Sequence, residues 1–416
     1  MIPPLSDINA LAALINTGSV NPAVASLQNL KVATRAVPDF FPDLLPFICD
    51  SADRGTAFLS DSRVIDCPGD IELSQKDCLA ILANAFLCRF TSRPSNNCRS
   101  RDGLPSINLD ELHGDTSQQS VARAKLKMIF EYFRRQRERA GAGDSLQRPL
   151  RFSRRKAQAA ASTDWLDCAA PLLPPVIEPL YRSLDDARDA LRIDFANRTI
   201  GGAAIASYGC AQEEIMFCLY PELIAARLYF TTLRDDESIL LRGAEQFSLA
   251  EDYGTDLGFG GRYIDPASLD KDGLLHSWIL AVDALDFRAQ DASRQYAPAL
   301  VMRELNKLWA GLWPLDGPVT VATGHWGCGI FGGNPAFKFL IQWAAFSRAE
   351  KTMRYFPWGD EDFALTMADI ISKTMRETPT VGLLVKRLFC PPNTLRDESS
   401  GSFGGLTKLC RRPSQS

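Results

Sequence analysis

The sequence has few of the residues that mark metal sites and disulfide frameworks. Its 416 residues include three histidines and eleven cysteines, and the cysteines form no CxxC pair. This composition favours neither a zinc site nor a disulfide framework, and we expect mostly buried, reduced thiols. No stretch approaches the roughly 20 consecutive apolar residues of a membrane span, and no positive residues precede the apolar ones at the start of the sequence. We therefore expect an intracellular protein that uses no metal.

The sequence also lacks a strong net charge of either sign. The formal net charge is −4, with 46% hydrophobic and 23% charged residues, which is typical of a globular chain large enough for two domains. We expect no general attraction to DNA or to a membrane surface. One basic segment, residues 141–164, contains GAGDSLQRPLRFSRRKAQAAAS. We interpret it as an exposed connection, with a polyanion contact site or a nuclear import signal as alternatives.

Hydrophobic periodicity predicts a helical region over residues 1–140. Within it, Leu126, Ile129, Phe130 and Phe133 follow the i, i+3, i+4, i+7 spacing of one helical face. This helix must therefore pack its apolar face on another part of the chain. We interpret residues 1–140 as a helical accessory domain.

Residues 165–390 have a different pattern, in which short β-branched or aromatic runs alternate with longer helical ones. Strands are predicted at 238–241, 278–283, 319–323 and 353–356, and helices at 221–231, 297–312 and 334–350. The alternation indicates an α/β domain, whose ligands bind beyond the carboxyl ends of the strands. Residues 391–416 are expected to form a flexible tail.

One glycine-rich loop, TGHWGCGIFGGN, is predicted between a strand and a helix at residues 323–334. Glycines in such a loop let backbone N–H groups approach a phosphate closely. Gly327, Gly329 and Gly332 also satisfy GxGxxG, the fingerprint of dinucleotide-binding oxidoreductases. Glu350 stands near the spacing of the acidic residue in that fingerprint, but at a predicted helix end. An irregular tight turn is a further alternative.

A second glycine-rich stretch, GGAAIASYGCAQEEI at residues 201–215, ends in the adjacent pair Glu213 and Glu214. Neighbouring residues at a helix start diverge by about 100° around the axis, so we expect that the two carboxylates do not face one atom together. Glycosidases usually flank the bond with carboxylates from separate places. The pair fits better a single acid/base with a neighbour that holds the sugar. The alternative is favourable charge at a helix N-terminus.

These motifs resemble the signature of poly(ADP-ribose) glycohydrolases of the eukaryotic type, which is three glycines, six to eight residues and then QEE. Here the signature comprises Gly201, Gly202 and Ala203, then eight residues, then Gln212, Glu213 and Glu214. The blocks LSQKDCLAILANAFLCRF, DFANR, FCLYPELIAARLY and GHWGCGIFGG also look like blocks of that family. The resemblance covers roughly residues 70–390.

The resemblance implies a macrodomain, with a mixed sheet flanked by helices, preceded by a helical accessory domain. It implies hydrolysis of the ribose–ribose O-glycosidic bonds of poly(ADP-ribose) on modified proteins, with release of ADP-ribose. The reaction would pass through an oxocarbenium-like transition state, with no cofactor and no metal. A monomer in the nucleus or the cytoplasm would fit this activity.

By position in the family motif, Glu214 would be the acid/base and Glu213 would bind ribose hydroxyls. The remaining implied substrate-binding residues are Asp185, Asp194, Asn197, Gly201, Gly202, Ala203, Gln212, Tyr253, Gly327, Gly329, Phe331, Gly332 and Trp358. Among them, Tyr253 would close on the substrate and Trp358 would stack on adenine. Ala203 departs from the family glycine, and this leaves open a macrodomain that binds ADP-ribose without cleaving the polymer.

Overall fold

The structure is a computed structural model, and it describes residues 7–18, 27–61, 63–90, 103–114, 118–157, 164–288 and 292–389. The described residues group into two compact units. We call the first the helix-rich unit; it takes in residues 1–154, 196–232 and 241–277. We call the second the parallel-sheet unit; it takes in residues 155–195, 233–240 and 278–416.

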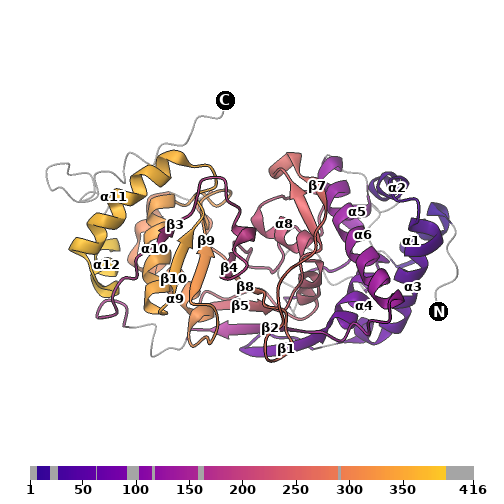
Figure 1. Ribbon diagram of the computed structural model, residues 1–416, viewed down its shortest axis with the longest axis horizontal. Coiled ribbons are helices and arrows are strands. Elements are labelled where there is room, and N and C mark those ends of the chain that lie inside the picture. The colour runs from indigo at the N-terminus through magenta and orange to yellow at the C-terminus, as the bar shows by residue number, and fades with distance from the viewer. Residues whose placement is uncertain are drawn as a thin grey trace. The chain divides into compact units, whose positions relative to one another are not determined.

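The helix-rich unit begins with a group of helices that pack on one another. Their bounds are α1 (Ile8–Gly18), α2 (Gln28–Arg35), the π-helix η2 (Phe40–Leu44), α3 (Leu45–Arg54), the 3₁₀ helix η3 (Thr56–Ser60), α4 (Gln75–Phe86), α5 (Asp110–His113) and α6 (Gln119–Gly141). Helix α6 packs against α2 and α5, and α3 packs against α4 (Figure 1). Buried rings of Phe40, Phe86 and Phe130 meet between these helices. Ser74 and Asp77 form a capping box that fixes the start of α4.

The later segments of the helix-rich unit carry shorter elements. They are α8 (Gln212–Leu219), the 3₁₀ helices η5 (Pro221–Leu228) and η6 (Gly254–Asp256), and the strands β6 (Ser248–Glu251) and β7 (Gly258–Arg262). Strands β6 and β7 pair antiparallel as a two-stranded sheet, and β7 packs against α6. The N-terminus of α8 carries the two glutamates predicted to matter for function.

The remaining strands form one mixed sheet of eight strands in the order β1-β2-β5-β8-β4-β9-β10-β3. Their bounds are β1 (Gly69–Ser74), β2 (Pro149–Lys156), β3 (Val176–Ile177), β4 (Leu191–Asp194), β5 (Glu237–Arg242), β8 (Trp278–Ala281), β9 (Thr320–Thr323) and β10 (Thr352–Tyr355). Strands β1 and β2 pair antiparallel, whereas β8, β4, β9, β10 and β3 pair parallel. The parallel strands β4 and β8 are buried at every residue, as expected for strands covered on both faces.

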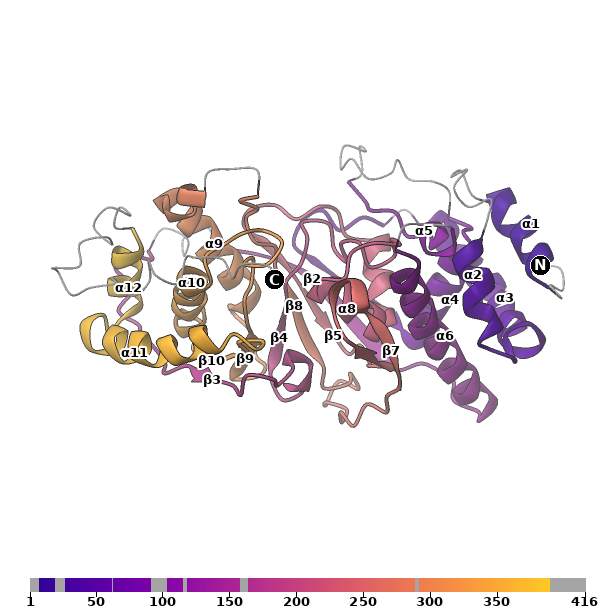
Figure 2. The same cartoon turned by 90° about the horizontal axis from the view of Figure 1, so that it is seen from above.

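Helices cover the parallel strands of the parallel-sheet unit. Their bounds are the 3₁₀ helices η4 (Leu184–Asp186) and η7 (Ala292–Tyr296), and α9 (Pro298–Leu312), α10 (Pro335–Arg348), α11 (Glu361–Glu377) and α12 (Val381–Leu388). Helix α10 lies between α9 and α12 and packs on β10 (Figure 2). The core of this unit contains the fully buried side chains of Trp326 and Trp343. Parallel strands with connecting helices place loops at the carboxyl ends of the strands, where ligands bind in such folds.

The structure confirms the predicted fold class: helices come first and a mixed sheet flanked by helices follows. The predicted strands correspond to β5, β8, β9 and β10, and two of the predicted helices to α9 and α10. The predicted helix at 221–231 is instead the 3₁₀ helix η5. The sequence analysis also did not predict strand β1, which lies within residues 1–140, the region interpreted as helical.

The interpretation of residues 141–164 as an exposed connection is wrong for residues 149–156. They form strand β2, with Leu150 and Phe152 fully buried. Arg154 is also buried, at 2% exposure, because its guanidinium donates to the Thr231 carbonyl and lies over the Phe230 ring. The basic composition of the segment predicts exposure to solvent, because it does not reveal the distant partners that bury Arg154.

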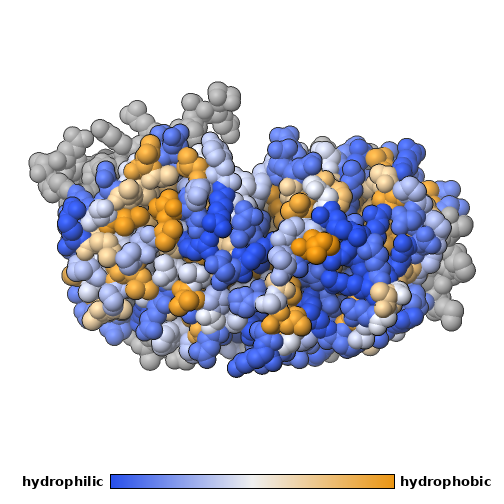
Figure 3. Space-filling model, in the orientation of Figure 1, coloured by the Kyte–Doolittle hydropathy of each residue, from blue (hydrophilic) through white to orange (hydrophobic). Residues whose placement is uncertain are grey.

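The described surface is mixed in character. On the face drawn in Figure 3, hydrophilic side chains predominate and hydrophobic ones form small separate groups. Among the described helices, none is both long enough and apolar enough to cross a membrane.

Candidate functional site

The first glycine loop precedes α8 in the helix-rich unit, and its backbone explains why it contains glycine. Gly201 and Gly202 have φ values of 78° and 40°, in the left-handed region that side chains disfavour. Gly209, later in the same loop, has φ 81°. Ala203 lies outside that region, so its methyl group imposes no backbone strain. The departure from the family glycine is therefore compatible with the conformation of the loop.

Glu213 is the buried member of the glutamate pair, with 2% of its surface exposed. Its Oε1 accepts the N–H of Gly201 at 2.7 Å, and its Oε2 accepts the N–H of Asn197 at 2.8 Å. Because both oxygens are held by backbone donors, the side chain has a fixed orientation. The same bonds tie the glycine loop to the start of α8.

Glu214 is the partly exposed member of the pair. Its Oε1 accepts the N–H of Ala203 at 3.1 Å, and its Oε2 accepts the N–H of Ala211 at 2.9 Å. The second bond is the carboxylate half of a capping box, because Glu214 is the third residue of α8. Glu214 therefore caps its helix and also reaches the glycine loop.

The expectation that the two glutamates do not face one atom together is wrong. A Cβ added to Gly202 would lie 2.6 Å from Glu213 Oε2 and 2.6 Å from Glu214 Oε1. Although the two residues diverge around the helix axis, their long side chains bend back to the loop that crosses the N-terminus of α8. Both carboxylates thus flank the position that a Cβ of residue 202 would take, and the absence of a side chain on Gly202 makes this approach possible.

Two buried cations lie beside this loop, and the sequence reasoning missed both. The Arg227 guanidinium, with 5% of the residue exposed, donates to the carbonyls of Ile200 and Gly202. Burial lowers its pKa to about 10, while the nearby Glu213 and Glu214 raise it. Lys125 of α6, which is fully buried, donates to loop carbonyls as well. A lysine between Val121 and Ile129 on an apolar helical face was the available signal.

The second glycine loop belongs to the parallel-sheet unit, between the end of β9 and the start of α10. Gly327 and Gly332 have φ values of 72° and 71°. A Cβ on Gly329 or Gly332 would meet no other atom within 4 Å, so this part of the loop is open. Asn334 caps α10 by accepting the N–H of Phe337 at 2.9 Å. An open glycine loop that runs into a helix N-terminus is suited to an anionic ligand.

Other predicted residues of the parallel-sheet unit lie near strand ends or in loops. Asp194 is fully buried at the carboxyl end of β4. Burial raises the pKa of the Asp185 carboxyl, against the effects of Arg192 and Arg188. Trp358 is 52% exposed and has φ 52°, an unfavourable backbone conformation for a bulky residue. Strained, exposed aromatics of this kind occur at ligand sites. Phe331 is half-buried in the second glycine loop, with the Arg288 guanidinium over its ring.

The structure brings five predicted residues into direct contact: Asn197, Gly201, Ala203, Glu213 and Glu214. Gly202 is flanked by the same carboxylates, and Gln212 is the first residue of α8. Tyr253 belongs to the helix-rich unit too, just before η6. The other predicted residues belong to the parallel-sheet unit. Among the described residues, no group of three or more His, Cys, Asp or Glu side chains could hold a metal ion.

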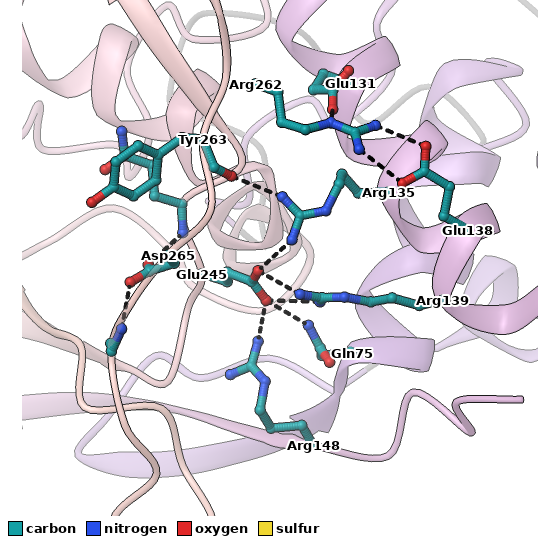
Figure 4. Close-up of polar contacts among 12 residues, drawn as sticks. Gln75, Glu131, Arg135, Glu138, Arg139, Arg148, Glu245, Arg262, Tyr263 and Asp265 are labelled. Atoms are coloured by element: carbon teal, nitrogen blue, oxygen red, sulfur yellow. Dashed lines mark hydrogen bonds and ion pairs between the residues drawn. The ribbon is translucent and has the colours of Figure 1, made fainter. Parts of the chain in front are cut away.

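A separate ionic cluster in the helix-rich unit holds α6 in place. Arg139 pairs with both oxygens of Glu245, at 2.8 and 2.6 Å, and Arg135 and Arg148 approach the same carboxylate (Figure 4). Arg135 also donates to the Tyr263 carbonyl at 2.8 Å. Since Glu245 is 4% exposed, these cations compensate a buried charge.

Comparison with known proteins agrees with this architecture. Family models match residues 33–146 as the helical domain of poly(ADP-ribose) glycohydrolase and residues 163–365 as its macro domain fold. A helical domain followed by a macro domain fold is the class that the chain represents.

Curated proteins that are similar to this chain are also named poly(ADP-ribose) glycohydrolases. The chain is 28% identical to poly(ADP-ribose) glycohydrolase 1 of Arabidopsis thaliana over 80% of its own length and 72% of that protein. It is also 28% identical to poly(ADP-ribose) glycohydrolase 1 of Caenorhabditis elegans, covering 77% of this chain and 41% of that one. The chain belongs to the poly(ADP-ribose) glycohydrolase family.

Proposed function

We propose that the chain hydrolyses the ribose–ribose O-glycosidic bonds of poly(ADP-ribose) attached to proteins and releases ADP-ribose. Membership of the family supports this substrate class. The observation that carries the mechanism is the unequal exposure of the two glutamates: Glu213 is 2% exposed, whereas Glu214 is partly exposed. A group that exchanges protons with substrate and water must be reachable, and a group that only holds a sugar can be buried.

In the proposed reaction, Glu214 gives a proton to the leaving ribose oxygen while the glycosidic bond breaks. The ribose then carries the positive charge of an oxocarbenium-like transition state. Glu214 next takes a proton from water, which adds to the same carbon, so one carboxyl group serves as acid and then as base. Glu213, fixed by the N–H groups of Gly201 and Asn197, binds ribose hydroxyls.

The proposed binding groups divide between the two glycine loops. In the helix-rich unit, the loop at 201–203 is proposed to bind phosphate; in the parallel-sheet unit, the open loop containing Gly327, Gly329, Phe331 and Gly332 is proposed to bind phosphate and ribose. A diphosphate near the ribose would favour the positive transition state electrostatically. Trp358, exposed and strained, is proposed to stack on adenine, and the half-buried Asp185 to bind the adenine edge.

A turnover assay with labelled poly(ADP-ribose) on a modified protein tests the proposal. We expect time-dependent release of ADP-ribose by the purified chain, together with binding of ADP-ribose in calorimetry. Binding with an intact polymer would instead establish a macrodomain that only binds its ligand. Tight binding of NAD without binding of ADP-ribose would favour the oxidoreductase alternative.

A further inference from the structure

The carbonyl groups of the first glycine loop point to buried cations, while its N–H groups point to the glutamates. Lys125 Nζ donates to the carbonyls of Ala203, Ala206 and Tyr208 at 2.9, 3.0 and 3.1 Å. An ammonium group has three donors, so all of them are engaged by this one loop. Lys125 itself is fully buried and comes from α6, in the helical region.

Arg227 supports the start of the same loop. Its Nη1 donates to the carbonyls of Ile200 and Gly202 at 2.7 and 3.1 Å, and its Nε donates to the carbonyl of Ser106 at 2.8 Å. Between them, the two cations hold five carbonyls of residues 200–208. A peptide unit joins the carbonyl of one residue to the N–H of the next, so Arg227, by holding the Ile200 and Gly202 carbonyls, fixes the N–H groups of Gly201 and Ala203 that reach Glu213 and Glu214.

A buried ammonium group contributes little to the free energy of unfolding by itself. Removal of its water costs about as much free energy as its new bonds return, and an apolar side chain of equal volume is often as stable. Burial lowers the pKa of Lys125, whereas Glu214 nearby raises it. The lysine instead fixes the orientation of the loop, because its three donors select one arrangement of three carbonyls. An apolar side chain would not select any arrangement.

We infer that Lys125 is a positioning residue: it fixes the loop from Ala203 to Tyr208, directly after the peptide unit that Arg227 holds by the Gly202 carbonyl, and so keeps the N–H of that unit, from Ala203, on Glu214. The accessory helix α6 is thus part of the machinery of the site. The link to catalysis rests on the proposed function, in which Glu214 is the acid/base.

Helix α6 is itself held firmly, so Lys125 starts from a fixed base. Arg139 binds both oxygens of Glu245, and Arg262 reaches back to Glu131 and Glu138 of the same helix, so these bonds anchor α6 without Arg135 (Figure 4). Arg135 is buried, at 7% exposure, and it also donates to a backbone carbonyl. It is therefore a matched control: a buried cation on the same helix whose contacts are with Tyr263, Glu245 and Phe247 and not with the glycine loop.

The test compares Lys125→Met with Arg135→Met in the full chain, well below the unfolding temperature of either variant. We expect Lys125→Met to lower kcat by about 100-fold, the loss typical of a catalytic group displaced by about 1 Å, while KM changes about threefold or less. Arg135→Met should unfold at a lower temperature but keep kcat within about threefold. Hydrogen–deuterium exchange should become faster in peptides covering 201–209 only in Lys125→Met.

Unchanged kcat and unchanged exchange at 201–209 in Lys125→Met would overturn the inference. So would an equal loss of kcat in Arg135→Met, because the effect would then follow stability. If the wild-type chain cleaves no polymer, the proposed function fails. The exchange experiment still decides whether Lys125 fixes the loop, since it needs no activity.

Discussion

The first glycine-rich loop and the open part of the second, at Gly329 and Gly332, use glycine for opposite reasons. In the first loop, a Cβ on Gly201, Gly202 or Gly209 would lie within 3 Å of Phe217, of the two glutamates or of Ala203. In the second loop, a Cβ on Gly329 or Gly332 would meet nothing. Glycine in the first loop makes room for the protein's own carboxylates, whereas glycine in the open part of the second leaves backbone accessible to a ligand.

This difference separates the proposed chemistry from the proposed binding. The first loop is closed on both sides, by glutamates at its N–H groups and by Lys125 and Arg227 at its carbonyls. Substitutions there should act on kcat. Substitutions in the open part of the second loop should act on KM and on the affinity for ADP-ribose.

The largest effect is expected for Glu214→Gln. The amide cannot supply the proton for the leaving oxygen, and general acid–base catalysis is typically worth 10²–10⁴-fold, so we expect kcat to fall about 10³-fold or more. One bond to the loop or to Ala211 is lost as well, because the amide offers one acceptor oxygen. Calorimetry should show ADP-ribose affinity within a few fold of wild type.

Glu361→Gln is the matched control, because Glu361 is also a first-turn glutamate, of α11, and is exposed. It should leave kcat unchanged. If Glu214→Gln cleaved the polymer at the wild-type rate, Glu214 would be a helix cap and the assignment of the acid/base would be wrong.

Alanine substitutions in the two loops should differ in kind. In Gly202→Ala the new Cβ would lie 2.6 Å from an oxygen of each glutamate, at φ 40°. The carboxylates must move, and we expect kcat to fall about 100-fold. In Gly329→Ala the Cβ meets no protein atom, so the fold should be unaffected and any change should appear in KM.

Steady-state kinetics on both variants, with unfolding temperatures, measures this contrast. Gly141→Ala, at the end of α6 with nothing near its Cβ, controls for the cost of a methyl group. A kcat loss of equal size in Gly202→Ala and Gly329→Ala would erase the distinction between the loops.

The sequence was sufficient for much of the fold, where hydrophobic pattern follows secondary structure. Strands β5, β8, β9 and β10 and helices α9 and α10 were predicted, because most of their buried residues are apolar, although α9 also buries Arg303, Glu304 and Lys307. Strand β2 was missed because Arg154 occupies a buried position, and its partner Thr231 is 77 residues away. A residue's burial by a distant partner leaves no mark in local composition.

The site shows the same limit. The glycines and the adjacent glutamates were recognisable as a motif, and the structure brings Gly201, Ala203, Glu213 and Glu214 into contact. Lys125 had a weaker signal, its place among the apolar residues of one helical face, and nothing in the sequence connected it with the carbonyl of Ala203, 78 residues away. Nor could spacing alone show that both carboxylates bend toward Gly202, because helix geometry places Cβ atoms and not the ends of long side chains.

Acid should lower the stability of the helices around His113. His113 of α5, a helix that packs on α6, is fully buried, with its ring edge-on to Phe86 at 4.9 Å. Burial lowers the pKa of His113 to about 3. The unfolded chain binds this proton near pH 6.5, so the stabilisation is complete above that pH and is lost as pH falls toward 3. The slope should approach about 1.4 kcal/mol per pH unit.

The measurement is the free energy of unfolding by urea at pH 7.5 and pH 5.5 for wild type and His113→Phe. Between these values the wild type should lose about 1.4 kcal/mol more than the variant. The ring of phenylalanine can keep the contact with Phe86 but cannot bind a proton. Equal losses in both proteins would show that His113 titrates normally or that other groups dominate the acid response.

The smallest effect is expected for Ala203→Gly, which restores the family glycine. Ala203 lies outside the left-handed region, so glycine relieves no strain, and we expect kcat within about twofold and a stability loss of about 0.4–1 kcal/mol from the freer unfolded chain. The methyl group instead faces Gly209, where an added Cβ would lie 2.7 Å from Ala203 Cβ.

A double-mutant cycle tests whether Gly209 makes room for the methyl group of Ala203. Gly209→Ala should be damaging in the wild type and less so beside Ala203→Gly, because the clash between the two methyl groups is then absent; the strain at φ 81° remains in both backgrounds. Coupling between the two positions, read in kcat and in unfolding temperature, would show that Gly209 accommodates the methyl of Ala203. A tenfold rise of kcat in Ala203→Gly alone would mean that this methyl group obstructs the substrate, and the tightly closed first loop would then be less well adapted to catalysis than its contacts indicate.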